Sequence, residues 1–191
     1  MELPSMICRK SDKGSAELAA RLLKEEKIII VPTDTVYGFS GIVDKTADKI
    51  RRIKGRAEDK PFIVLIAKPE DMNLFTTAAL PQKLLDYWPG ALTVIVPSID
   101  GKGTVAVRCP GDEWLRRVIA LAGSPIYSTS VNRSGKPVLD TFSAIQREFE
   151  ADTALIVDDG DKINAVPSTI VQYDGTVRLV RQGGLEVAEK W

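Results

Sequence analysis

The chain contains no histidine and only two cysteines, and these absences exclude several kinds of chemistry. Without histidine there is no Ser-His-Asp triad, no Cys-His pair and no histidine-containing zinc site. The two thiols, Cys8 and Cys109, are too few for a four-cysteine metal site or a disulfide framework. We therefore expect two free thiols in a reducing compartment, and any enzymatic activity must rely on other side chains.

Net charge and long apolar runs are absent as well. The 26 basic and 26 acidic side chains cancel, so an anion site must be local rather than spread over the whole surface. The longest apolar run, residues 62–67, is far shorter than the roughly 20 residues of a membrane helix. The first residues do not resemble a signal peptide, because no apolar segment follows a basic one. These features predict a cytoplasmic protein with no membrane partner.

The pattern of apolar and polar residues predicts alternating helices and strands in one domain of 191 residues. Asp112 is the expected N-cap of one helix, Ser143 to Gln146 a capping box for another, and Asp174–Gly175 a hairpin turn. The predicted fold class is α/β, a twisted mixed parallel and antiparallel sheet with helices packed on it. Helices are expected over residues 15–27, 46–54, 81–88, 112–121 and 143–150, and strands over 28–31, 62–67, 92–96, 104–108, 126–130, 155–157, 169–173 and 176–180.

Three polar side chains directly follow the first predicted strand. Thr33, Asp34 and Thr35 come after Pro32, which keeps the backbone out of the helical region and places these side chains on a loop. Ligands in open α/β sheets collect beyond strand ends, so two hydroxyls and a carboxylate suit a binding site here. An ordinary strand-to-turn connection explains the same residues, because Asp and Thr are common in turns.

A local excess of basic residues lies between residues 45 and 60. Seven Lys or Arg side chains accompany three acidic ones, which leaves a charge of about +4. Lys54, Arg56 and Lys60 lie close to a glycine and ahead of a predicted buried strand. This arrangement suits a polyphosphate, because Arg grips phosphate in a fork and Lys supplies a point charge. A solvated helix end is the alternative, since basic residues favour helix C-termini.

Other predicted strands also end in polar residues. Arg108 shares a strand face with Thr104, which suits a carboxylate or phosphate, although a surface ion pair is the simpler reading. The hydroxyls and amides of residues 128–135 suit ribose, phosphate or a carboxylate, or else form a polar turn. Residues 167–169 and 181–184 have the same character. There is no GxxxxGK[ST] loop and no GxGxxG turn, so any ATP must bind by another route.

Read in order, seven segments resemble the motifs of one family, the YrdC-type threonylcarbamoyl-adenylate synthases. Each motif alone is weak, but seven in the right order are highly specific, and the match spans about residues 14–184. The sequence departs from the usual motifs at Asp34, where Glu is commoner, and at Lys60, where many members carry Asn. The segments are Pro32–Gly38, Lys54–Arg56 with Pro61, Trp88–Thr93, Val105–Arg108, Ser130–Gly135, Pro167–Ile170 and Arg181–Gly183.

The resemblance implies a single YrdC/RibB-like domain over residues 1–191, with its sheet around a large basic cavity. It also implies a nucleotidyltransferase that converts L-threonine, bicarbonate or CO2 and ATP into threonylcarbamoyl-adenylate and diphosphate. That product supplies the carbamoyl group for N6-threonylcarbamoyladenosine at position 37 of tRNA. A hand-off of the labile adenylate to a tRNA threonylcarbamoyl transferase complex is expected on the same ground.

The motif positions also assign roles to individual residues. Lys54 and Arg56 are the expected catalytic residues, because they would carry the charge of the phosphates. Mg2+ is expected as cofactor, carried by ATP with no metal ligand from the protein. Threonine is expected at Thr33, Arg108 and Ser168. The nucleotide is expected at Lys54, Arg56, Lys60, Thr104, Ser130, Asn132 and Arg181.

Two other functions stay open on sequence alone. The first is an RNA- or ribosome-binding module that uses the same fold without catalysis and grips an RNA backbone in the basic cavity. The zero net charge argues against it, although weak RNA binding beside catalysis is also expected from the resemblance. The second is a related carbamoyl-adenylate activity of the kind used in hydrogenase maturation. Those proteins are long and carry zinc-binding segments, and this sequence shows neither feature.

Overall fold

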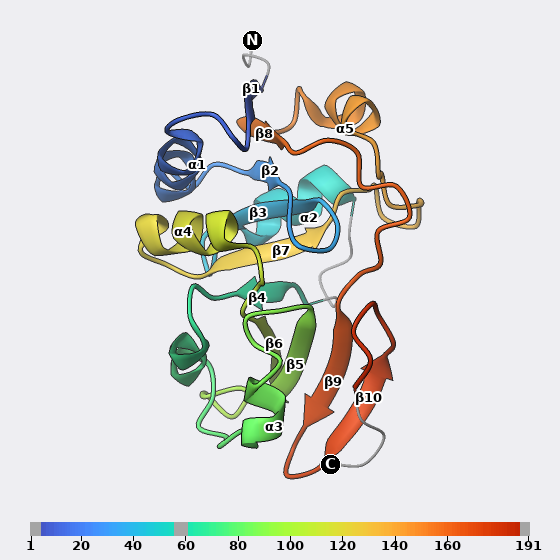
Figure 1. The fold of residues 1–191 in the computed structure, drawn as a ribbon. Coiled ribbons are helices and arrows are strands. Elements are labelled where there is room, and N and C mark those ends of the chain that lie inside the picture. The colour runs from blue at the N-terminus through green and yellow to red at the C-terminus, as the bar shows by residue number, and fades with distance from the viewer. Residues whose placement is uncertain (1–4, 56–60, 188–191) are drawn as a thin grey trace.

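One large mixed sheet organises the computed structural model, which describes residues 5–55 and 61–187. Its ten strands are hydrogen-bonded in the order β1-β8-β2-β3-β7-β4-β6-β5-β9-β10. The sheet twists strongly: β3 and β7 run across the view in Figure 1, whereas β5, β9 and β10 run down it. The strands are β1 (Met6–Arg9), β2 (Ile29–Val31), β3 (Gly38–Ile42), β4 (Ile63–Leu65), β5 (Leu92–Pro97), β6 (Thr104–Arg108), β7 (Ile126–Ser130), β8 (Leu155–Asp158), β9 (Thr169–Tyr173) and β10 (Val177–Arg181).

Helices cover both faces of the half of the sheet that contains β2, β3 and β7 (Figure 1). α1 (Ser15–Lys24) and α4 (Glu113–Ala122) pack on one face, and their apolar residues form a single core with that face. α2 (Ala47–Lys54) and α5 (Phe142–Phe149) pack against residues of the opposite face. The other half of the sheet carries a third core, which includes residues of α3 (Gln82–Leu85) and the 3-10 helix η1 (Pro69–Leu74).

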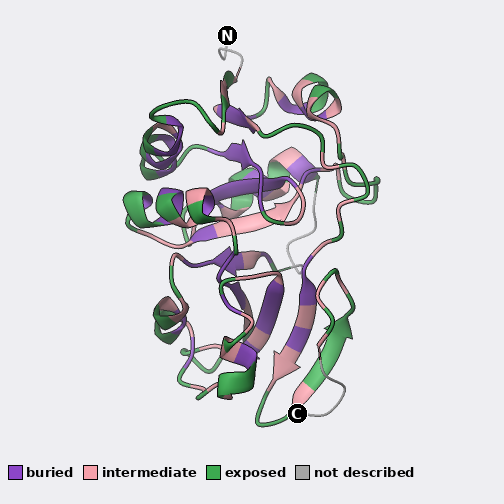
Figure 2. Cartoon of the chain, in the orientation of Figure 1, coloured by how far each residue is buried: buried purple, intermediate pink, exposed green. Residues whose placement is uncertain are grey.

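β2 shows why the predicted strand there is apolar at every position. Ile29 and Val31 point into the core with α1 and α4, whereas Ile30 points into the core with α2 and α5. Successive side chains of a strand alternate between faces, so a strand covered on both sides needs apolar residues throughout. Figure 2 shows the contrast with β10, an edge strand that is largely exposed.

The structure confirms the predicted helices and strands, with ends that differ by a few residues. The predicted N-cap is also confirmed, because Asp112 accepts a hydrogen bond from the Leu115 backbone N–H at 3.0 Å at the start of α4. β5 and β6 pair antiparallel, and the hairpin at Asp174–Gly175 joins β9 to β10. The predicted capping box at Ser143 is wrong. α5 begins one residue earlier, with Thr141 as N-cap and no side-chain capping bond.

Two strands that the sequence analysis did not predict are β1 and β3. β3 has the sequence Gly-Phe-Ser-Gly-Ile. Glycine has a low β-strand propensity, so the local sequence does not indicate a strand here. A methyl group built on Gly38 would lie 2.8 Å from the Ser128 Oγ, so the neighbouring strand β7 leaves little room for a side chain here. β1 pairs with β8 at the sheet edge, where its Met6 and Ile7 stay exposed.

The register of the sheet separates two groups of predicted site residues. Ser130 at the end of β7 pairs with Gly38, while Arg108 at the end of β6 lies level with Leu65, which pairs with Ile126 at the start of β7. Ser130 and Arg108 are therefore at opposite ends of their antiparallel strands, although they share a face of the sheet. The expectation that strand ends alone bring these residues together is thus incomplete, and the loop of residues 32–37 supplies the connection.

Candidate functional site

Arg108 is the centre of the first group of site residues. Its side chain is 5% exposed and makes three hydrogen bonds with the protein. Nη2 lies 2.5 Å from Asp34 Oδ1, Nη1 donates to Thr35 Oγ1 at 3.0 Å, and Nε donates to the Gly90 carbonyl at 3.0 Å. Burial lowers the pKa of Arg108 and the Asp34 carboxylate opposes that shift, so the cation is balanced by its partner.

The loop of residues 32–37 is held in one conformation by its own hydroxyls. Thr33 is buried, and its Oγ1 donates to the Val36 carbonyl at 2.7 Å and lies 3.0 Å from Thr35 Oγ1. The Thr35 backbone N–H in turn donates to Thr33 Oγ1 at 3.0 Å. Pro32 ends β2 and starts this compact turn, which carries Asp34 and Thr35 to Arg108.

Ser168 lies on the segment that leads into β9, a strand that is separated from β6 and its Arg108 by β5 alone. Its Oγ is 2.8 Å from Thr93 Oγ1 of β5, and both residues are buried. Arg181, at the end of β10, donates through Nη2 to the Ser168 carbonyl at 2.8 Å. Burial lowers the pKa of Arg181, and the charge of Arg108 lowers it further.

The close approach of two chain segments fixes this corner of the site. A methyl group on Gly183 would collide with the backbone of residues 167–169, so only glycine allows the chain after β10 to pass there. The Gly183 N–H donates to Thr169 Oγ1 at 3.0 Å and the Gly184 N–H donates to the Pro167 carbonyl at 3.1 Å. Two of the sequence motifs are thus bonded to each other, and Ser168 belongs to the first of them.

Lys54 is the centre of the second group. It is the last residue of α2, is 3% exposed, and lies 5.3 Å from the centre of the Phe39 ring. Its Nζ donates to the Ser130 carbonyl, and to the carbonyl and Oδ1 of Asn132 at 2.9 Å each. Ser130 Oγ also donates to Asn132 Oδ1, at 2.8 Å. A buried ammonium group therefore organises the turn after β7.

Gly38 connects the two groups. It pairs with Ser130 across β3 and β7, and a methyl group placed on it would lie 4.0 Å from the Thr33 methyl group. The path of contacts runs from Lys54 through Ser130 to the start of β3, and then through the 32–37 loop to Arg108. Thr33 and Ser168 belong to the Arg108 group, so the structure brings all three predicted threonine-binding residues into one region.

The other predicted nucleotide-binding residues are divided between the two groups and the rest of the chain. Thr104 is exposed at the start of β6, at the other end of the strand from Arg108. Arg56 and Lys60 lie outside the described residues. Arg181, Ser130 and Asn132 lie within the two groups above.

Sequence reasoning missed several partners that position Arg108 and Ser168. Asp34 and Thr35 were expected only as part of a binding loop and not as partners of Arg108, and the Gly90 carbonyl and Thr93 received no role. Gly111 lies outside every motif, yet its N–H donates to Asp34 Oδ2 at 2.9 Å. The sequence signal for Asp34, Thr35, Gly90 and Thr93 is their position within a motif. No pattern in the sequence indicates a role for Gly111.

The donor set of this region favours anions over metal ions. Lysine and arginine nitrogens, hydroxyls and an amide suit phosphate and carboxylate groups. In residues 5–55 and 61–187, no group of three Cys, Asp or Glu side chains is arranged to hold a metal ion. Cys109 is buried, and burial raises the pKa of its thiol to about 11, so it is a poor nucleophile at neutral pH.

Two hollows lie beside the described residues of this region. One, of about 600 Å³, is lined by Arg9, Lys10, Trp114 and Asp159, among others, and borders the Tyr37 side of the site. The other, of about 710 Å³, lies between η1 and α4. Neither includes Arg108 or Lys54 in its lining, so the large basic cavity implied by the sequence motifs stays a prediction. No helix in the described part of the chain is long and apolar enough to span a bilayer.

Fold and site together describe an α/β domain in which buried cations and hydroxyls gather around the loop after β2. A family model for Sua5, YciO and YrdC proteins, described as "Telomere recombination", matches residues 21–183. The chain belongs to this Sua5/YciO/YrdC family.

Individual curated proteins are also similar to this chain in sequence. The chain is 33% identical to the threonylcarbamoyl-AMP synthase of Pyrococcus abyssi, over 96% of its own length and 58% of the relative. It is 35% identical to that of Bacillus subtilis, over 87% of this chain and 53% of the relative. The chain thus spans little more than half the length of these curated relatives.

Solved structures agree in fold. The P. abyssi Sua5 structure complexed with L-threonine has a TM-score of 0.83 at 29% identity, covering 97% of this chain and 58% of that one. E. coli YciO has a TM-score of 0.81 and covers 97% of both chains, but at 18% identity it supports the fold alone.

Proposed function

We propose that the protein is an L-threonylcarbamoyladenylate synthase. The observation that carries the proposal is the buried Arg108, whose guanidinium group is held by Asp34, the Thr35 hydroxyl and the Gly90 carbonyl. Such a site suits the carboxylate and hydroxyl of a small amino acid. The relationship to threonylcarbamoyl-AMP synthases and to a structure complexed with L-threonine supports threonine as that amino acid.

Threonine would bind with its carboxylate at Arg108, and with Thr33 and Ser168 forming the remainder of its site. A guanidinium group holds a carboxylate through two parallel hydrogen bonds, so binding would require Arg108 to share or exchange donors that now face Asp34 and Thr35. Arg181 next to Ser168 would add positive charge on the nucleotide side. The amine, in its neutral form, is then free to react.

The nucleotide would bind along the path from Arg108 to Lys54. Arg181, Ser130 and Asn132 are the described residues proposed for it, with Thr104, Arg56 and Lys60 extending the site. Lys54 now donates to backbone and amide oxygens, so we propose that it holds the turn after β7 for the nucleotide and adds positive charge for the phosphates. Mg2+ would enter with ATP, because its preferred ligands are phosphate oxygens.

The reaction would proceed by positioning and charge neutralisation rather than by a covalent enzyme intermediate. The threonine amine forms a bond to the carbon of CO2 and loses a proton, which gives a carbamate. With bicarbonate, the C–OH bond breaks and the amine proton leaves with that hydroxide as water. A carbamate oxygen then attacks the α-phosphorus of ATP, the bond to the bridging oxygen breaks, and diphosphate leaves. Lys54 and Arg56 would offset the charge that develops on the phosphates, and bound reactants need no stronger catalyst than correct orientation.

Diphosphate release tests the proposal directly. Purified protein is incubated with ATP and Mg2+, with threonine and bicarbonate present together, singly or not at all, and the adenylate is identified by mass spectrometry. Diphosphate and adenylate are expected only when both co-substrates are present. An Arg108→Met variant serves as the matched control and is expected to lose activity. Protein that binds ATP and threonine yet forms no adenylate would refute the proposal.

The same assay distinguishes the alternative of an RNA-binding module. Salt-dependent RNA binding that survives Lys54→Ala and Arg56→Ala, without adenylate synthesis, would favour that alternative. Transfer of the threonylcarbamoyl group to tRNA, with a carbamoyl transferase complex added, tests the proposed hand-off and modification of position 37.

A further inference from the structure

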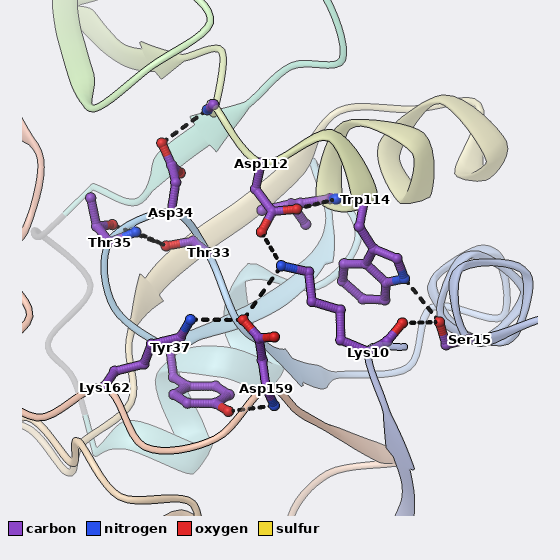
Figure 3. Close-up of polar contacts among 12 residues, drawn as sticks. Lys10, Ser15, Thr33, Asp34, Thr35, Tyr37, Asp112, Trp114, Asp159 and Lys162 are labelled. Carbon is purple, nitrogen blue, oxygen red and sulfur yellow. Dashed lines mark hydrogen bonds and ion pairs between the residues drawn. The ribbon is translucent and has the colours of Figure 1, made fainter. Parts of the chain in front are cut away.

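Lys10 joins three segments of the chain next to the candidate site (Figure 3). It lies just after β1, and its Nζ is 2.5 Å from Asp112 Oδ2 and 3.4 Å from Asp159 Oδ2. The Asp112 side chain is only 8% exposed, so this ion pair is largely shielded from water. Burial alone would lower the pKa of Lys10, but its bonds to Asp112 and Asp159 outweigh that effect and raise it. The ammonium group is therefore firmly charged.

Asp112 connects Lys10 to the loop after β2, through the neighbouring residue Gly111. One carboxylate oxygen takes the Lys10 bond and the other caps α4 through the Leu115 N–H. The preceding residue, Gly111, donates its N–H to Asp34, and a methyl group on Gly111 would lie 3.0 Å from the Asp34 carboxylate. The position of Asp112 thus sets the backbone group that holds Asp34.

Asp34 connects Gly111 to Arg108. Its Oδ2 accepts from Gly111 while its Oδ1 pairs with the guanidinium at 2.5 Å. Lys10 is therefore connected to the arginine at the centre of the site by three polar contacts and by the peptide bond between Gly111 and Asp112. None of the sequence motifs contains Lys10 or Asp112.

Asp159 links Lys10 to the same loop from the other side. Its carboxylate also pairs with Lys162 at 2.7 Å, and its backbone N–H donates to the Tyr37 hydroxyl at 2.8 Å. Tyr37 is fully buried and donates in turn to the Gly160 carbonyl at 2.8 Å. Lys10 therefore contacts Asp159, which bonds to Tyr37 at the end of the 32–37 loop, and Asp112, which follows the glycine that bonds to Asp34 (Figure 3).

Charge gives the lysine a second effect. Asp34, Asp112 and Asp159 bring three carboxylates close to the loop, and Lys10 pairs with two of them. Without the ammonium group, the Asp112 carboxylate would keep only its helix-cap bond, next to the Gly111–Asp34 contact. Excess negative charge at this point would disfavour a substrate carboxylate at Arg108.

We infer that Lys10, acting through Asp112 and Gly111, is a positioning residue that fixes Asp34 and Arg108 for the carboxylate of the amino-acid substrate. The inference rests on the proposed function for the identity of that substrate. Lys10 touches neither Arg108 nor the 32–37 loop directly, so its effect is on substrate affinity rather than on the chemical step.

The test is Lys10→Met, which keeps the length of the side chain and removes the charge. The lysine borders a hollow of about 600 Å³, so methionine fits without crowding. We expect the KM and the calorimetric Kd for threonine to rise about three- to thirtyfold, with kcat and the Kd for ATP within about twofold of wild type. Lys10→Arg is expected to recover most of the affinity.

Two further variants separate positioning from general stability. Arg117→Met removes an exposed ion pair with Glu17 that also joins α4 to α1, and it is expected to leave threonine affinity unchanged. Asp112→Asn keeps a side chain that caps helices and weakens the bond to Lys10, but it removes a negative charge instead of a positive one. It therefore isolates the positioning effect, and it is expected to raise the KM for threonine in the same direction as Lys10→Met but by a smaller factor.

Distinct outcomes overturn the two proposals. If wild-type protein makes the adenylate and Lys10→Met binds threonine equally well, the role of Lys10 is refuted and the proposed function stands. If Lys10→Met and Arg117→Met weaken threonine and ATP alike, the role is refuted as a general stability effect. If wild-type protein makes no adenylate and binds no threonine, the proposed function falls, and the inference falls with it.

Discussion

The Arg108 guanidinium and the Asp34 carboxylate lie 2.5 Å apart, and this ion pair joins the end of β6 to the loop after β2. Arg108 is almost fully buried, whereas the Asp34 side chain is 21% exposed. The pair therefore connects the interior of the domain to the open side of the site. It also spans the two halves of the sheet, because β6 and β2 are separated by β3, β7 and β4.

Asp34→Asn should destabilise the fold, because it leaves a buried arginine without its counter-charge. We expect the free energy of unfolding to fall by about 2 kcal/mol, within the range for an uncompensated hydrogen-bonded charge. Urea unfolding followed by circular dichroism measures the change. Asp48→Asn is the control, since Asp48 pairs with Arg51 but is 86% exposed, and it should change stability by less than about 0.5 kcal/mol.

Lys54→Met should disorder the turn after β7 and weaken nucleotide binding together. The ammonium group donates to oxygens of the half-buried Ser130 and Asn132, and methionine would remove all three of these bonds. We expect ATP affinity to fall at least about tenfold, as measured by calorimetry. Lys49→Met is the matched control, because Lys49 lies on the same helix and donates only to the Glu26 carbonyl at the surface. Equal ATP affinity in both variants would contradict the role of Lys54.

The fold was largely predictable from sequence because its helices and strands have clear apolar patterns. β2, for example, is apolar at every position and buried on both faces. β3 was not predictable, since two of its five residues are glycines that are needed for contacts with other segments. Such contacts with distant residues leave no local pattern, so a tertiary requirement overrides propensity there.

The sequence named individual candidate residues but not how they are arranged in space. The motifs located Thr33, Arg108 and Ser168, which the structure brings into one region. They did not indicate that Arg108 and Ser130 lie at opposite ends of antiparallel strands, because register depends on pairings between distant segments. Backbone groups such as the Gly111 N–H carry no sequence signal at all, since every residue except proline has one.

Thr93 and Ser168 should behave as a coupled pair. Their hydroxyl oxygens are 2.8 Å apart and both residues are buried, so each single change leaves a buried hydroxyl without its partner. Thr93→Val and Ser168→Ala are each expected to destabilise the fold, and the double variant by about 1 kcal/mol less than their sum. Denaturant unfolding of all four proteins gives the coupling energy. Strict additivity would show that the hydroxyl contact contributes nothing.

Tyr37 should make the fold sensitive to alkaline pH. Burial raises the pKa of its hydroxyl to about 12, above the ordinary value of 10.0, so the folded state holds this proton more tightly than the unfolded state does. The resulting stabilisation is complete below pH 10 and is lost as the pH rises from about 10 to about 12. In that window the free energy of unfolding should fall with a slope that approaches about 1.4 kcal/mol per pH unit for this one proton.

Tyr37→Phe isolates the contribution of this hydroxyl to the pH dependence. The variant loses the hydrogen bonds to Asp159 and Gly160, so it should be less stable than wild type at neutral pH. Its stability should nevertheless fall less steeply between pH 10 and 12, because phenylalanine has no proton to lose. Other groups, including Cys109, whose burial raises the thiol pKa to about 11, contribute equally to both proteins and cancel in the difference. Parallel stability curves for the two proteins across this range would show that the Tyr37 hydroxyl is not the group responsible.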